Sequence, residues 1–194
     1  MYRVFLTLLV FCWTAVGLAE DSSSSKFPSP DGRFALRIAA DLKVELIEKA
    51  SGEVMVDLGT VYSRYLSHPE ETVLVWSADS KWAAYATRGN REGDTSVYFW
   101  NGSAFEGVSL PDDLPGPEIK FRKGESGGVK NYGGAVKPLR WLKSGGLELS
   151  SDLMMLSRGD GRSYTGVVLI TLAFDAQHHA SVQKVGKTKT KVVE

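Results

Sequence analysis

The feature that most constrains the fold is an alternation of apolar and polar residues with a period of two. Within 33–38, Phe34, Leu36 and Ile38 fall on one side of an extended chain. From residue 27 onward, no segment keeps an apolar period of 3.6 residues over the length of a helix. Further segments with strand-type patterning lie at 43–48, 54–58, 81–88, 95–100, 104–110, 146–151, 164–174 and 180–185. The pattern predicts an all-β, antiparallel protein.

Residues typical of tight turns separate these segments. Pro30-Asp31-Gly32 and Asn101-Gly102 supply a fixed proline φ and residues that tolerate positive φ. Asn101-Gly102 stands between two short apolar stretches, which predicts a hairpin. The segment 111–138 is rich in Gly, Pro and Lys and interrupts the strand pattern, so it is predicted to be a long loop inserted in the domain, with one short strand possible near 119–122.

A sequence repeat underlies the strands. Residues 29–36 read Ser-Pro-Asp-Gly-Arg-Phe-Ala-Leu, and residues 76–85 read Trp-Ser-Ala-Asp-Ser-Lys-Trp-Ala-Ala-Tyr. A third, eroded copy begins at 139–149. These blocks resemble the WD40-like, or PD40, β-propeller repeat of the TolB family, whose hallmark is Trp-Ser-Pro-Asp-Gly/Ser-Lys/Arg before an apolar strand. The resemblance implies a single β-repeat domain over 27–186 with about three degenerate repeats.

The number of repeats does not decide whether the domain closes into a ring. Propellers close with about four or more blades of roughly 40–45 residues, whereas residues 27–185 number 159. A minimal ring with a degenerate blade, an open arc completed by self-association and a twisted β-sandwich are all compatible with this length. Trp76 and Trp141, which precede two of the turns, are predicted to pack between neighbouring sheets.

The amino terminus has the features of a secretory signal peptide at 1–19. Arg3 precedes an apolar run, and Gly17-Leu18-Ala19 places small residues at a cleavage site. A flexible linker is predicted at 20–26 and a polar tail at 187–194. Cleavage removes Cys12, the only cysteine, and leaves no transmembrane segment. Export without disulfides is typical of a bacterial envelope protein, so a secreted or periplasmic location is predicted.

Charge and motifs exclude several functions. The chain has 23 basic and 23 acidic residues, which argues against nucleic acid as a partner. Gly124-Glu125-Ser126-Gly127-Gly128 matches a nucleophile motif, but the sequence that follows is not helical. On a strand, adjacent His178 and His179 would point to opposite faces and could not chelate one ion. We therefore assign no catalytic residue, metal ligand or cofactor, and we favour a non-enzymatic protein over a hydrolase.

The inserted segment is the predicted binding surface. It combines a glycine-rich backbone with cationic side chains and one aromatic anchor, which suits an acidic or carbohydrate-rich partner; these residues are Lys120, Arg122, Lys123, Lys130 and Tyr132. The leading hypothesis is an exported β-repeat protein that binds another protein or a cell-envelope component. The alternative is a small periplasmic inhibitor or enzyme-accessory domain acting through 111–138, because Ser126-Gly127-Gly128 and Tyr132 are similar to the loop of periplasmic lysozyme inhibitors.

Overall fold

The computed structural model describes residues 25–61, 72–87, 92–121, 128–158 and 161–193, and these contain strands and turns but no α-helix. Sheet A comprises β1 (Phe34–Ile38), β2 (Lys43–Glu48) and β3 (Val54–Thr60). Sheet B comprises β4 (Thr72–Trp76), β5 (Trp82–Thr87), β7 (Thr95–Trp100) and β8 (Phe105–Val108). Sheet C comprises β6 (Glu92–Gly93), β9 (Val129–Trp141), β10 (Leu147–Ser157), β11 (Ser163–Phe174), β12 (Ala180–Val185) and β13 (Lys189–Val193). The all-β prediction is confirmed.

Each sheet is built on a meander of consecutive antiparallel segments. Sheet B runs β4-β5-β7-β8, and sheet C runs β9-β10-β11-β12, with β13 beside β11 and β6 parallel to β9. In sheet A the first segment is reduced to Lys26, which pairs with Leu36 through two backbone hydrogen bonds of 2.7 and 2.8 Å. The sequence repeat is thus matched by three structural repeats of four segments each.

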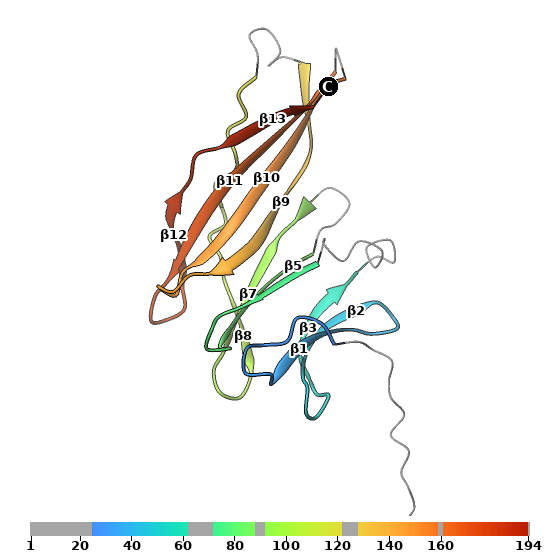
Figure 1. The fold of residues 1–194 in the computed structure, drawn as a ribbon, viewed down its shortest axis with the longest axis vertical. Helices are drawn as coiled ribbons and strands as arrows, with labels where there is room; N and C mark the ends of the chain where they lie inside the picture. The colour runs from blue at the N-terminus through green and yellow to red at the C-terminus, as the bar shows by residue number, and fades with distance from the viewer. Residues whose placement is uncertain (1–24, 62–71, 88–91, 122–127, 159–160, 194) are drawn as a thin grey trace, which may run out of the picture.

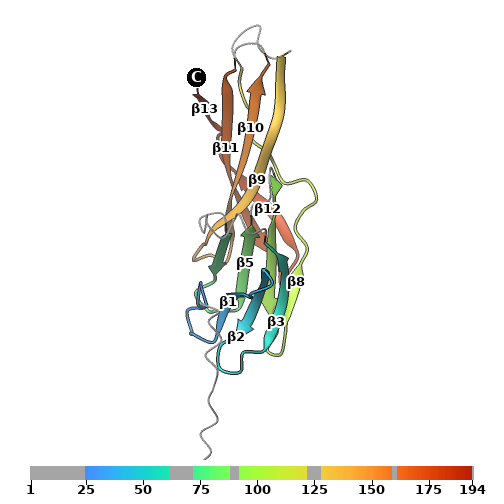
Figure 2. The ribbon, with the colours of Figure 1, turned by 90° about the vertical axis from the view of Figure 1, so that its right-hand side faces the viewer.

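The three sheets lie in an open row with sheet B in the middle (Figures 1 and 2). One apolar cluster joins sheets A and B, and a second joins sheets B and C. Strand β5 makes this possible because Ala83 belongs to the first cluster and Ala84 to the second, so that small side chains admit a neighbour on both faces. Sheets A and C share no core cluster, and the described chain therefore forms no closed ring.

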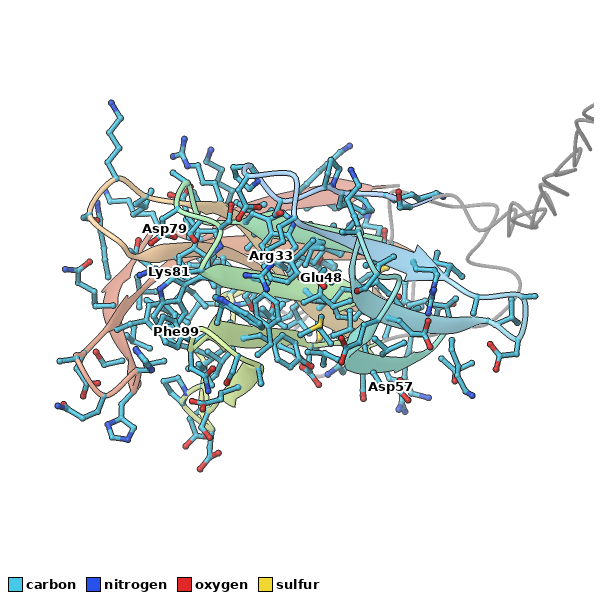
Figure 3. The ribbon with its side chains drawn as sticks, turned by 90° about the horizontal axis from the view of Figure 1, so that it is seen from below. Arg33, Glu48, Asp57, Asp79, Lys81 and Phe99 are labelled. Atoms are coloured by element: carbon cyan, nitrogen blue, oxygen red, sulfur yellow. The ribbon has the colours of Figure 1, made fainter. Side chains whose placement is uncertain are left out.

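An aromatic group fills the centre of the first cluster. The Phe34 ring lies 4.9 Å from that of Phe105, 5.0 Å from that of Trp100 and 6.2 Å from that of Trp76. Arg33 covers this group: its guanidinium lies 4.7 Å from the Phe34 and Trp100 ring centres. The same side chain forms an ion pair of 2.9 Å with Glu48 of β2 (Figure 3).

The structure corrects the predicted loop at 111–138. Strand β9 begins at Val129, so residues 129–138 belong to a strand paired with β10 along its length. The glycines that suggested a loop permit close strand packing instead: a Cβ on Gly134 would lie 2.3 Å from the Asp152 carbonyl oxygen. Residues 114–121 cross sheet C, where the Phe121 ring meets Tyr164 edge-on at 5.2 Å.

The predicted boundaries of the domain also change. Lys189–Val193 forms β13 along the edge of β11, so 187–194 is not merely a polar tail. Lys26, placed in the predicted linker, already pairs with the domain. Residues 1–24, including the predicted signal peptide, lie outside the described residues. Among those described, no helix is long and apolar enough to span a membrane.

Candidate functional site

The turns that open the repeats are stabilised by the same hydrogen bonds. Ser29 Oγ donates to Asp31 Oδ1 at 2.6 Å, and Ser77 Oγ donates to Asp79 Oδ1 at 2.5 Å. In both turns that carboxylate oxygen also accepts from the amide two residues further on, at 3.0 and 3.1 Å. The serine oxygen then accepts from the amide five residues after it, at 2.9 Å in each turn. The shared Ser-x-Asp spacing therefore encodes one local structure.

Tryptophans at equivalent positions connect neighbouring sheets. Trp76 Nε1 donates to the Phe27 carbonyl at 2.9 Å, and Trp141 Nε1 donates to the Val75 carbonyl at 3.2 Å. Each acceptor lies two residues before the turn serine of the preceding repeat. Both indoles also pack against the core clusters, which agrees with the predicted role between sheets. Pro28 occupies the equivalent position in the first repeat, so that repeat has no indole donor and begins the row.

A groove of about 400 Å³ lies where the turns of sheets B and C meet. Three indoles line it, from Trp76, Trp82 and Trp141. Asp79 and Lys143 contribute opposite charges to the same groove, and both residues are exposed. A smaller groove of about 250 Å³ also contacts Trp82 on the side of the β11–β12 hairpin. The junction thus offers apolar ring surface beside a carboxylate and an ammonium.

Behind the indoles, aromatic rings support Trp82 on several sides. Phe99 and Phe174 each lie 4.8 Å from the Trp82 ring, and Trp141 lies 5.5 Å from it. The His178 ring lies 3.6 Å from Phe99. His178 has a φ of 65°, and its amide donates to the Asp175 carbonyl at 3.0 Å. The tight β11–β12 hairpin therefore holds an imidazole against the cluster.

The predicted binding residues do not form one projecting loop. Lys130 and Tyr132 belong to strand β9, and Tyr132 is 43% exposed. Lys120 lines a separate cavity of about 630 Å³ beside β12 and β13. Arg122 and Lys123 lie outside the described residues. The groove could not be recognised from the prediction that Trp76 and Trp141 pack between sheets, because each indole that lines it combines core packing with a surface in the groove.

The described residues contain no group of three or more His, Cys, Asp or Glu side chains that could hold a metal ion. His179 Nδ1 lies 3.2 Å from Asp175 Oδ2 at an exposed site. A backbone hydrogen bond from His179 lowers the pKa of Asp175, and this supports the hairpin. Ser126 of the nucleophile-like motif lies outside the described residues.

The carboxylates of the two turns make stability depend on pH. For Asp31 and Asp79, partial burial raises the pKa, but hydrogen bonds from the turn serine and a backbone amide outweigh it and hold each pKa below 3.8. The stability that these hydrogen bonds contribute is fully present above pH 3.8, the ordinary pKa of an aspartate. It is lost as the pH falls through the lowered pKa values of the folded protein. Replacing both by Asn, which keeps an accepting oxygen, should flatten the dependence of the unfolding free energy on pH below about 4.

Urea unfolding at a series of pH values tests this dependence. Asp113→Asn, on an exposed segment, is the control for removing a negative charge. Equal pH slopes for the double variant and the unchanged protein would contradict the assignment.

Comparison with solved structures includes a TolB structure of low similarity. A crystal structure of TolB from Acinetobacter baumannii matches with a TM-score of 0.33 and 9% identity, covering 80% of this chain and 41% of that chain. The chain therefore spans less than half the length of that TolB. No family model matches the chain, and no curated protein matches it. The structural repeats described above rest on the turn and tryptophan hydrogen bonds.

Proposed function

We propose that the protein is an exported, non-enzymatic binding protein that holds a cell-envelope component in the groove between sheets B and C. The observation that carries this proposal is the gathering of three indoles with Asp79 and Lys143 at one sheet junction. Ligand sites typically combine mostly apolar walls with a few oriented polar groups. The sequence features of export support an envelope location.

The groove favours a ligand with apolar and polar faces. Indole rings offer flat apolar surface, while the carboxylate and the ammonium can bond hydroxyl, amide or ionised groups. A saccharide unit of an envelope polymer has both kinds of surface. Because the walls are two turns closed by their own backbone hydrogen bonds, the groove is formed before a ligand arrives, and binding orders little of the protein.

Tryptophan fluorescence during titration with soluble envelope glycan fragments tests the proposal. The expected result is a saturable change in emission, since three indoles line the groove. Lys143→Ala should weaken binding by about tenfold, the loss of one charge-assisted hydrogen bond. Lys49→Ala, at an exposed site in the β2–β3 connection of sheet A, is the matched control. An emission that no fragment changes, or equal affinities for both variants, would contradict the proposal.

The inhibitor or enzyme-accessory function is the second candidate. One observation favours it: the chain is held on both sides of 122–127, by Phe121 against Tyr164 and by β9 from Val129. Recognition loops are commonly carried on such fixed ends. If this function applies, replacing Arg122 and Lys123 by Ser should abolish capture of an envelope hydrolase while Lys143→Ala leaves capture intact.

A further inference from the structure

Charge is unevenly distributed along the chain although its total is zero. Residues 128–194 contain ten basic and five acidic residues, whereas residues 1–127 contain thirteen basic and eighteen acidic ones. The first part carries sheets A and B, and the second carries nearly all of sheet C. The net charge of zero therefore combines a positive C-terminal part with a negative N-terminal part.

Sheet C has one face against sheet B and one face turned away. Leu149 and Ile170, directly opposite each other on β10 and β11, are fully buried in the second core cluster. Their neighbours in sequence point the other way, and Leu169 is 42% exposed. The outer face is therefore the one that carries Ser150, Val167 and Leu169.

The strand register places cations along both sides of this outer face. Lys184 lies opposite Thr171, and Lys189 and Lys191 lie opposite Val167 and Thr165. On the other side, Lys137 lies opposite Ser150 and Arg140 lies opposite Glu148. We call this set the lysine face; its cations are Lys137, Arg140, Lys184, Lys189 and Lys191.

The carboxylates on the same face, Glu148 and Asp152, offset only part of the charge of its five cations. Glu148 is already bonded to Arg140 at 2.8 Å. Asp152 Oδ1 accepts a hydrogen bond from the Ala135 amide at 3.2 Å.

Three lysines, Lys184, Lys189 and Lys191, follow one edge of β11 over about 20 Å, since their partners on β11 span six residues. Figure 1 shows β12 and β13 in succession along that edge of β11. A strip containing Leu169, Val167 and Thr165 separates the two rows of cations.

We propose that the lysine face binds an anionic polysaccharide, independently of the groove between sheets B and C. Lysine ammonium groups act as point charges and need no planar partner, which suits acidic groups spaced along a flexible chain. The strip between the rows offers hydroxyls and aliphatic surface to sugar rings. Strands β10, β12 and β13 contain no aromatic residue, and on β11 Tyr164 is fully buried and Phe174 packs against the second core cluster. These four strands therefore offer no ring for the stacking that supports single-stranded nucleic acid.

The outer face of sheet A in a second copy does not complement the lysine face. The outer face of sheet A carries Arg37 and Lys43 with Glu45 and Asp57 and is therefore balanced in charge. Arg37 pairs with Glu45 at 2.8 Å. Successive repeats are joined by a tryptophan indole that donates a hydrogen bond to the preceding repeat. In the first repeat of a following copy, Pro28 stands at this position and has no such donor.

Binding of dextran sulfate, with uncharged dextran as the blank, tests the proposal by calorimetry at about 50 and 200 mM salt. We expect saturable binding of the sulfated polymer only, weakened by salt. The triple variant Lys184→Thr, Lys189→Thr, Lys191→Thr should weaken binding by about tenfold or more. The matched control, Lys43→Thr, Lys49→Thr, Lys81→Thr, removes the same charge from sheets A and B and should change affinity less than about twofold.

Three results would overturn the proposal: no binding of dextran sulfate at low salt, equal losses in the two triple variants, or equally tight binding of single-stranded DNA. Thermal unfolding verifies that each variant is folded. If the first triple variant is unfolded, Lys137→Thr with Lys184→Thr replaces it, and the same tenfold expectation applies. Lys143→Ala should leave dextran sulfate binding unchanged, so a failure of the groove proposal remains distinguishable from a failure here.

Discussion

Phe34→Ala is expected to lower the free energy of unfolding by about 3–5 kcal/mol, the usual cost of removing a buried phenylalanine ring. The side chain is 1% exposed, and its ring contacts those of Trp76, Trp100 and Phe105. These rings belong to sheets A and B, so the cavity would open between two sheets that the rest of the chain cannot easily bring closer. Urea unfolding monitored by circular dichroism measures the change.

Val54→Ala is the control for this experiment. Val54 lies on β3 of the same sheet but is 43% exposed, and its truncation should change stability by less than about 0.5 kcal/mol. A Phe34→Ala protein that unfolds at nearly the same urea concentration as Val54→Ala would show that the cluster between sheets A and B does not stabilise the fold.

The turns and their strands could be predicted from sequence because their determinants are local. Ser29 and Asp31 are two residues apart, and their side chains satisfy amides within the same turn. The alternation in β1 likewise reports directly which side chains meet sheet B. Wherever the interaction partner is close in sequence, the residue pattern contains the information.

The strands that sequence analysis missed depend on distant partners. Gly133-Gly134 is typical of a loop. In the structure Gly133 has a φ of 145°, and the backbone of Asp152 on β10 leaves no room for a Cβ on Gly134. Strand β13 buries little, and its alternation of Lys and Thr carries no hydrophobic signal, although its backbone pairs with β11. Composition describes such segments as polar, while their structure is determined by an available strand edge.

The candidate groove was missed for the same reason. Asp79 and Lys143 belong to turns of different repeats, and neither has a neighbour in sequence that predicts a site. Trp141 links the two turns through its bond to Val75, and this contact appears only once sheets B and C are packed. The repeat predicted where the turns begin, but the space between them is a property of sheet packing.

Gly134→Ala is expected to destabilise the protein by about 1–3 kcal/mol or more, which is the range for forcing extra volume into a packed site. An added Cβ would lie 2.3 Å from the Asp152 carbonyl oxygen and 3.3 Å from the Leu153 Cα. Both are backbone atoms of β10, so relief requires the two strands to separate. The substitution removes no side-chain contact, and the whole effect therefore measures how closely β9 and β10 must approach.

Gly107→Ala, within strand β8, is the matched control for this effect. A Cβ at Gly107 meets no atom within 4 Å, and its backbone has no positive φ. The same change there should be neutral or stabilise the protein by up to about 1 kcal/mol, because alanine restricts the unfolded chain. If the two variants unfold at equal urea concentrations, residues 129–138 do not pair tightly with β10, and the predicted loop at 111–138 would be restored.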